Sequence, residues 1–70
     1  MRQPTPRQQA ILNFLREEPG KLWDPPMIAA VVSRKGIPTH PLAAGKALRR
    51  LAQRKAIKMT RADNGYSYFV

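Results

Sequence analysis

Apolar side chains recur at helical spacing in three segments of the chain, and near its end they alternate with polar ones. The first apolar set consists of Ala10, Ile11, Phe14 and Leu15. Thr5 and Gln8 stand at the spacing of a capping box, and Pro6 occupies the first helical position, which proline favours. This pattern predicts a helix that begins after Thr5 and that Pro19-Gly20 ends.

A second helix is predicted between Asp24 and Gly36. Asp24 suits an N-cap, Pro25 follows at the first helical position, and Gly36 suits the left-handed residue that ends many helices. The apolar side of this helix consists of Ile28, Val31 and Val32. Residues 21–23 lie between helix-breaking segments and are too few for a helix, so they predict a strand of one to three residues.

A third helix is predicted from about Pro41 to Lys55, after a turn formed by residues 36–39, with either Thr39 or His40 as its cap. Steps of about 100° per residue give this helix an apolar back and a cationic front. The back consists of Ala44, Ala47, Leu48 and Leu51. The front consists of Leu42, Lys46, Arg49 and Gln53, with Arg50 at its flank.

Two β-rich runs, residues 56–61 and 66–70, flank an Asp-Asn-Gly turn and predict a hairpin. Ile57 and Met59 alternate with Lys58 and Thr60, so we expect one face of the first strand to be apolar and the other solvated. The order of elements is that of a three-helix winged helix-turn-helix domain with a C-terminal β-hairpin as its wing, an α+β fold. We expect residues 5–70 to form this domain and residues 1–4 to form a loose tail.

The positive charge of the chain is concentrated in its second half. Thirteen Lys and Arg residues against four Asp and Glu residues give a formal net charge of +9. Residues 1–33 carry four basic and three acidic side chains, whereas residues 34–70 carry nine basic and one acidic. This segregation favours a polyanion-binding surface over a basic protein without a polyanionic partner.

The sequence lacks the features of several function classes. Seventy residues hold one small domain without room for a deep substrate cavity. The chain has no cysteine, nothing around its only histidine, His40, has metal-ligand spacing, and no catalytic set of side chains is recognisable. We therefore expect no enzymatic activity, no cofactor and no metal site.

Neither a secretory signal nor a membrane span is indicated by the sequence. The N-terminal residues have no apolar core, and the longest apolar run, Met27–Val32, is far shorter than the ~20 residues that cross a bilayer. We expect no membrane partner and a cytoplasmic location, either at the nucleoid or in the host cytoplasm if the protein is phage-encoded.

The second and third helices with their turn have the layout of a helix-turn-helix, in which the later helix enters the major groove of DNA. Lys46 and Arg49 are expected at base edges or flanking phosphates, and Gln53 at adenine. Arg50 and Arg54 are expected mainly at phosphates. Thr39 and His40 complete the predicted recognition helix at its start, where His40 either caps the helix or contacts a phosphate.

Two residues of the third helix keep two interpretations each. Leu42 either touches a thymine methyl group or packs against the turn near Ile37. Gly45, which costs a helix roughly 1 kcal/mol relative to alanine, permits a close approach either to the second helix or to a phosphate.

The hairpin is the second predicted contact element. Lys58, Arg61 and Asn64 are its candidate DNA contacts, with Arg61 placed on the backbone or in the minor groove. Its aromatic residues Tyr66, Tyr68 and Phe69 are expected to close the core against Trp23 and the first helix. A base-stacking role for these rings is the less favoured alternative.

Residues 5–15, Thr-Pro-Arg-Gln-Gln-Ala-Ile-Leu-Asn-Phe-Leu, resemble the opening helix of the DNA-binding domain of LexA-type SOS-response repressors. Residues 47–57 with the ending Gly-Tyr-Ser-Tyr-Phe are similar to the recognition helix and wing of many winged-helix regulators. In its small size the domain also resembles phage-encoded regulators and excisionases, which use the same architecture. The resemblance implies the fold and the groove-reading role of the third helix. Pro38 and Pro41 depart from the repressor pattern, and the seventy residues contain no counterpart of the repressor's self-cleavage domain.

The leading hypothesis is a sequence-specific regulator that binds double-stranded DNA without chemistry, as a monomer or as a homodimer on DNA. An alternative is a protein-interaction module, such as an inhibitor or adaptor, that grips an acidic protein partner on the same scaffold. A third is an RNA- or single-strand-binding protein that uses the hairpin aromatics.

Overall fold

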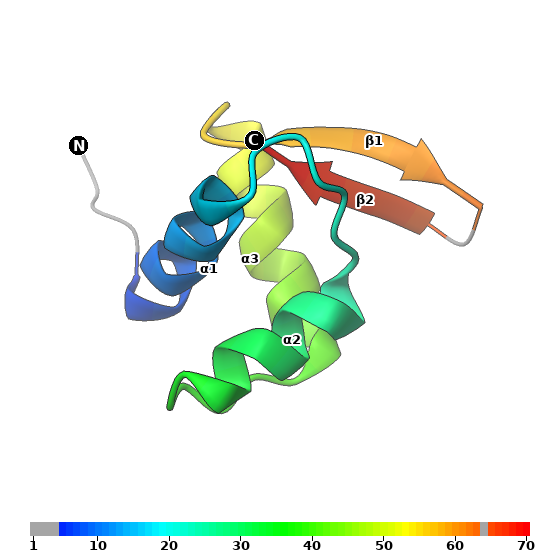
Figure 1. Ribbon diagram of the computed structural model, residues 1–70. Coiled ribbons are helices and arrows are strands. Elements are labelled where there is room, and N and C mark those ends of the chain that lie inside the picture. Colours follow the sequence, from blue (N-terminus) through cyan, green and yellow to red (C-terminus); the bar gives the residue numbers. More distant parts are fainter. Residues whose placement is uncertain (1–4, 64) are drawn as a thin grey trace.

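The computed structural model describes residues 5–63 and 65–70. Three helices precede an antiparallel hairpin, in the order α1 (Pro6–Glu17), α2 (Pro25–Arg34), α3 (Pro41–Gln53), β1 (Lys58–Ala62) and β2 (Gly65–Phe69) (Figure 1). The three helices pack together, and the hairpin extends from the end where α3 finishes (Figure 1). The predicted α+β winged helix-turn-helix architecture is therefore confirmed.

The helices begin at the caps that the sequence predicts. At α1, the backbone N–H of Gln8 donates to Thr5 Oγ1 (3.1 Å) and the N–H of Thr5 donates to Gln8 Oε1 (3.3 Å), which completes the capping box. At α2, the N–H of Met27 donates to a carboxylate oxygen of Asp24 (2.9 Å). These bonds satisfy backbone donors that the first helical turn leaves without a partner.

Both helices of the helix-turn-helix end in a Schellman arrangement, in which a left-handed residue redirects the chain. After α2, Gly36 has φ +95°, as predicted, and the N–H of Ile37 donates to the carbonyl of Val32 (3.2 Å). After α3, the left-handed residue is Lys55 (φ +62°). The helix therefore ends at Gln53 and not at Lys55 as predicted, because a lysine in the left-handed position leaves no glycine to mark the end.

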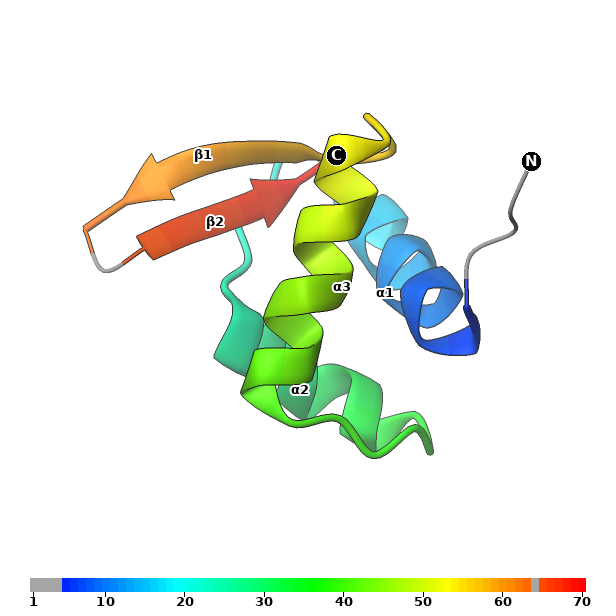
Figure 2. The same ribbon diagram turned by 180° about the vertical axis from the view of Figure 1, so that it is seen from behind.

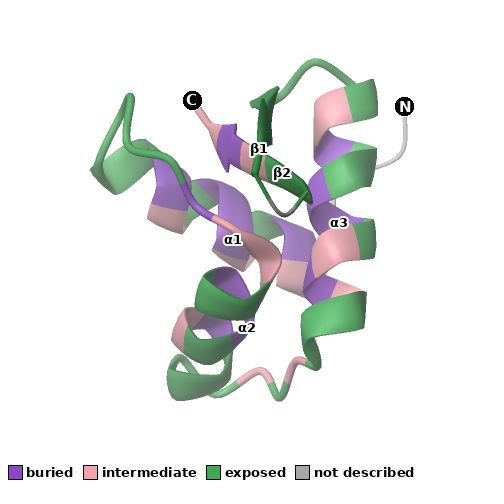
Figure 3. Ribbon diagram, turned by 90° about the vertical axis from the view of Figure 1, so that its right-hand side faces the viewer, coloured by how far each residue is buried: buried purple, intermediate pink, exposed green. Residues whose placement is uncertain are grey.

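The core lies where the three helices meet one face of the hairpin, and the buried stripe of α3 faces it (Figure 3). All four residues of the predicted apolar back of α3 are buried. Ile11, Leu15, Ile28 and Val32 are buried as predicted, whereas Val31 is only partly so. The core also contains Leu12 and Ala29, which the predicted apolar faces did not include. Gln8 is buried with them because its side chain is held in the capping box.

The hairpin is tied to the segment between α1 and α2. Met59 pairs with Tyr68, and Ala62 pairs with Gly65 at the far end of the two strands. Trp23 forms a one-residue bridge with Tyr68 on the other edge of β2, so residues 21–23 supply the predicted short strand. One face of β1 was predicted to be apolar, but only Ile57, just before the strand, is buried, and Met59 is 44% exposed. The difference arises because β1 is the edge strand, and β2 alone reaches the core.

Within residues 5–63 and 65–70, no helix is long and apolar enough to cross a membrane.

Candidate nucleic-acid interface

The outward face of α3 carries the residues that the sequence assigns to DNA contact. Figure 2 shows α3 in front of α1 and α2, with the hairpin to its side. Its exposed residues on this face are Leu42, Lys46, Arg49, Arg50 and Gln53, and Arg54 at its C-cap is exposed as well. Because helical geometry places positions 42, 46, 49 and 53 within an arc of about 60°, these side chains form one line along the helix. We call the line Leu42, Lys46, Arg49 and Gln53 the α3 front.

The turn before α3 is held by side chains from α1 and α2. Ser33 Oγ accepts from the N–H of Thr39 (3.1 Å) and donates to the carbonyl of Thr39 (3.3 Å). Arg7 of α1 donates from Nη2 to the carbonyl of Pro38 (3.1 Å). Thr39 itself donates from Oγ1 to the carbonyl of Ile37 (2.8 Å). These contacts fix the direction in which α3 leaves α2, and sequence reasoning missed Ser33 and Arg7 because their partners are set only by the folded chain.

His40 is the N-cap of α3, which decides between the two predicted caps. Its Nδ1 accepts from the N–H of Leu42 (3.1 Å), so this nitrogen is an acceptor in the folded chain. The ring is exposed at the start of the α3 front, while Thr39 is partly buried with its hydroxyl turned to the backbone of the turn. His40 is therefore placed for an outward contact better than Thr39 is.

The acidic residues do not neutralise the cations of α3 and β1. Glu18 pairs with Lys21 (3.3 Å) and Glu17 with Lys35 (3.9 Å), and both pairs lie at the C-terminal ends of α1 and α2. The same two lysines stand over aromatic rings, Lys21 over Trp23 at 4.6 Å. No ion pair is formed by the basic side chains of α3 or β1 in the part of the chain that the structure describes. The α3 front therefore retains its positive charge.

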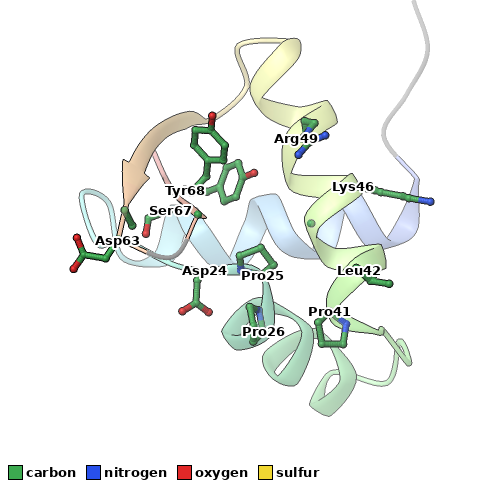
Figure 4. Close-up of a pocket in the computed structure, with 14 residues that line it drawn as sticks. Asp24, Pro25, Pro26, Pro41, Leu42, Lys46, Arg49, Asp63, Ser67 and Tyr68 are labelled. Atoms are coloured by element: carbon green, nitrogen blue, oxygen red, sulfur yellow. The ribbon is translucent and has the colours of Figure 1, made fainter.

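A groove of about 870 Å³ runs between α3, the hairpin and the start of α2 (Figure 4). Leu42, Lys46 and Arg49 line its α3 side. In Figure 4 the carboxylates of Asp24 and Asp63 lie on the side of the groove away from Lys46. A polyanion in this groove is therefore attracted toward Lys46 and Arg49 on its α3 side.

A second groove of about 780 Å³ lies between the C-terminal end of α3 and the base of the hairpin. We call it the basal groove; its cationic residues are Arg49, Lys55 and Lys58, and no acidic residue lines it. Its apolar residues are Ala52, Ile57, Met59, Tyr66 and Phe69. Sequence reasoning missed Lys55 and Met59 as lining residues because one was placed inside the helix and the other in the core.

The two described wing cations point to opposite faces of the hairpin. Residues that face each other across an antiparallel pair share one face, so Arg61 lies with Tyr66, while Lys58 lies with Phe69. The Lys58 ammonium stands 6.0 Å from the Phe69 ring centroid and borders the basal groove. The structure therefore does not bring the two cations together on one face. Asn64, the third predicted wing contact, lies outside the described residues.

The three aromatic residues of β2 were predicted to close the core, but only Tyr68 is fully buried there. Tyr68 is buried beside Trp23, whereas Phe69 is partly buried and Tyr66 is 43% exposed. Trp23 in turn packs edge-to-face against Phe14 of α1, with 4.7 Å between the ring centroids. Tyr66 lines both grooves and is the accessible aromatic side chain on the α3 side of the wing.

The structure decides between the alternatives for Leu42 and Gly45 of α3. Leu42 is 73% exposed, which removes the interpretation that it packs against the turn near Ile37. A methyl group added at Gly45 would lie 3.7 Å from Pro25, an ordinary van der Waals distance. Gly45 faces α2, as one interpretation proposed, but contact with α2 does not require a glycine.

In the described part of the chain, no group of three His, Asp or Glu side chains is placed to hold a metal ion. The element order, the buried back of α3 and the paired hairpin together define a winged helix-turn-helix domain. A scan of protein-family models finds no match, and searches of curated proteins and of solved structures find no significant match.

Proposed function

We propose that this protein binds double-stranded DNA sequence-specifically and acts as a transcriptional regulator without catalytic chemistry. The observation that carries the proposal is the α3 front: a line of exposed side chains, cationic at Lys46 and Arg49, on a helix whose back is buried. A single helix with its side chains fits the major groove, which is about 12 Å wide. The resemblance to winged-helix regulators implies the same groove-reading role for α3.

In this proposal α3 enters the major groove and the wing follows the backbone or the adjacent minor groove. Lys46 and Arg49 donate to guanine edges or phosphates, and Gln53 makes an adenine contact where the groove presents one. Arg50 and Arg54 flank this line and contact phosphates. The lysines paired with Glu17 and Glu18 stand at the C-terminal ends of α1 and α2 and take no part.

Fluorescence anisotropy with a library-selected duplex tests the proposal. Lys46→Ala and Arg49→Ala are each expected to cost about 1–3 kcal/mol of binding free energy if the side chain reads a base. Each variant that loses a phosphate contact lowers the log–log salt slope by about 0.9. Arg16→Ala is the matched control, because Arg16 is an exposed arginine of α1 and its removal changes the net charge equally. Equal losses for Arg16→Ala and Arg49→Ala would contradict a localised interface.

The basal groove favours a second candidate function, the docking of an acidic protein segment with apolar side chains. Its lining includes the cations Arg49, Lys55 and Lys58 and the exposed Met59. The substitution Met59→Gln distinguishes the two functions, because it affects duplex affinity and partner binding differently. This change is expected to leave duplex affinity nearly intact, whereas it disrupts an interface whose apolar centre is Met59. Failure of any duplex to bind, together with loss of partner binding in Met59→Gln, would favour this second function.

A further inference from the structure

Leu42 is the most exposed large apolar residue of the described chain, at 73%. It is the second residue of α3, at the end that a recognition helix directs toward base edges. It lies on the same line as Lys46 and Arg49, about 6 Å along the helix from Lys46. A single exposed leucine is ordinary on a protein surface. The distinctive feature of Leu42 is its position beside Lys46 and Arg49 on the α3 front.

The residues from the first turns of α2 and α3 that line the groove are apolar. Pro25 and Pro26 of α2 line the same groove as Leu42, together with Pro41 of α3 (Figure 4). We call these four residues, Leu42 included, the apolar shelf. None of them offers a side-chain hydrogen-bond donor or acceptor. The shelf therefore suits an apolar group, and it adjoins a stretch of α3 that attracts a polyanion.

We infer that the apolar shelf is a thymine-methyl subsite and that Leu42 is the residue that reads it; the inference rests on the proposed function. Thymine presents its C5-methyl group in the major groove, where this apolar feature marks the position of a thymine. Lys46, one helical turn further on, stands about two base pairs away along the groove, within reach of a neighbouring guanine. The recognised sequence thus contains a thymine beside the positions that Lys46 and Arg49 contact.

A methyl group on one base gives a direct test, because deoxyuridine has the same hydrogen-bonding edge as thymidine without the methyl. A binding site is first selected from random duplexes with the unchanged protein. Each thymidine of the selected site is then replaced singly by deoxyuridine, and affinity is measured by anisotropy. One replacement is expected to lower the duplex affinity of the unchanged protein about fourfold, which is the factor for burial of one methyl-sized group. The same replacement is expected to leave the duplex affinity of the Leu42→Ala protein unchanged.

A reciprocal substitution checks the same contact with an added methyl group. When cytosine stands at the sensitive position, 5-methylcytosine is expected to bind the unchanged protein more tightly than cytosine does, and Leu42→Ala is expected to bind both equally. Leu22→Ala is the matched control, since Leu22 is a 51% exposed leucine outside both grooves. It should keep the deoxyuridine sensitivity of the unchanged protein.

The outcomes separate this inference from the proposed function. A selected motif whose deoxyuridine sensitivity is the same in Leu42→Ala overturns the role of Leu42 and leaves the DNA-binding function standing. Selection that enriches no motif overturns both. If Leu42→Ala changes the stoichiometry of binding instead of a base preference, the shelf is a contact between protein molecules, which also overturns the inference.

Discussion

Trp23 and Tyr68 exchange two backbone hydrogen bonds, from the N–H of Trp23 to the carbonyl of Tyr68 (3.0 Å) and from the N–H of Tyr68 to the carbonyl of Trp23 (2.8 Å). The N–H of Gly20 adds a further bond to the carbonyl of Val70 (2.9 Å). These bonds join β2 to the segment that leads into α2. The wing is therefore positioned relative to the helix-turn-helix from both sides, by the chain after α3 and by this bridge.

Substitution of Trp23 tests how far the wing depends on this junction. Trp23→Ala is expected to lower the free energy of unfolding by about 3–5 kcal/mol, because it removes a buried ring and its contact with Phe14. Trp23→Phe is expected to cost clearly less. It keeps a ring against Phe14 and removes an indole N–H that is buried without a hydrogen-bond partner among the described residues. Urea unfolding measures both; equal losses would contradict this account.

Gly45→Ala is expected to stabilise the protein. Alanine favours a helix interior by roughly 1 kcal/mol over glycine, and the added methyl group meets Pro25 at 3.7 Å without a clash. For a domain of this size the gain corresponds to a rise in Tm of about 4–8 °C. Calorimetry measures the rise, and duplex affinity measured alongside is expected to stay unchanged. A higher Tm with a large loss of affinity would instead show that a phosphate needs the space beside Gly45.

Ser33→Ala is expected to loosen the turn of the helix-turn-helix. The change removes both hydrogen bonds between Ser33 and the backbone of Thr39. With about 1 kcal/mol for a hydrogen bond, exchange of the Thr39 amide proton is expected to accelerate about fivefold. Hydrogen exchange by NMR measures this, with Arg34→Ala as a neighbouring exposed control. An unchanged Thr39 exchange rate would mean that the Arg7 contact to Pro38 holds the turn alone.

The parts of this fold that could be predicted are those that local sequence determines. The caps at Thr5 and Asp24 depend on residues no more than three positions away, so their spacing is visible in the sequence. The two faces of α3 follow from a constant angle per residue, which the folded chain preserves. Gly36 could be placed because the left-handed conformation favours glycine.

The remaining features depend on contacts that join distant segments. Arg7 and Pro38 are 31 residues apart, and neither residue type indicates the pairing. The exposure of Met59 follows from the position of β1 at the edge of the hairpin, which alternation within one strand does not determine. The apolar shelf likewise combines the first turns of α2 and α3, so only Leu42 on the front of α3 could be singled out in advance.

Tyr66 and Tyr68 distinguish duplex binding from single-strand binding through the wing. Tyr68→Ala is expected to destabilise the fold by about 3–5 kcal/mol, because this side chain is buried, so its effect on binding is not informative. Tyr66→Ala should leave the Tm nearly unchanged, since Tyr66 is exposed. If α3 carries duplex binding, Tyr66→Ala weakens it less than Arg49→Ala does. Stacking on this ring would instead contribute about 1–3 kcal/mol per base to single-strand binding.

Parallel titrations with a duplex and with each of its separated strands give the measurement. The unchanged protein is expected to prefer the duplex, and Arg49→Ala is expected to lose most of that preference. Tyr66→Phe is the conservative control, because it keeps the ring and removes the hydroxyl group. The protein would instead bind through the wing if it bound a single strand more tightly than the duplex, and if Tyr66→Phe kept this binding while Tyr66→Ala lost it. Arg61, which shares the hairpin face of Tyr66, would then contact the strand's phosphates beside that ring.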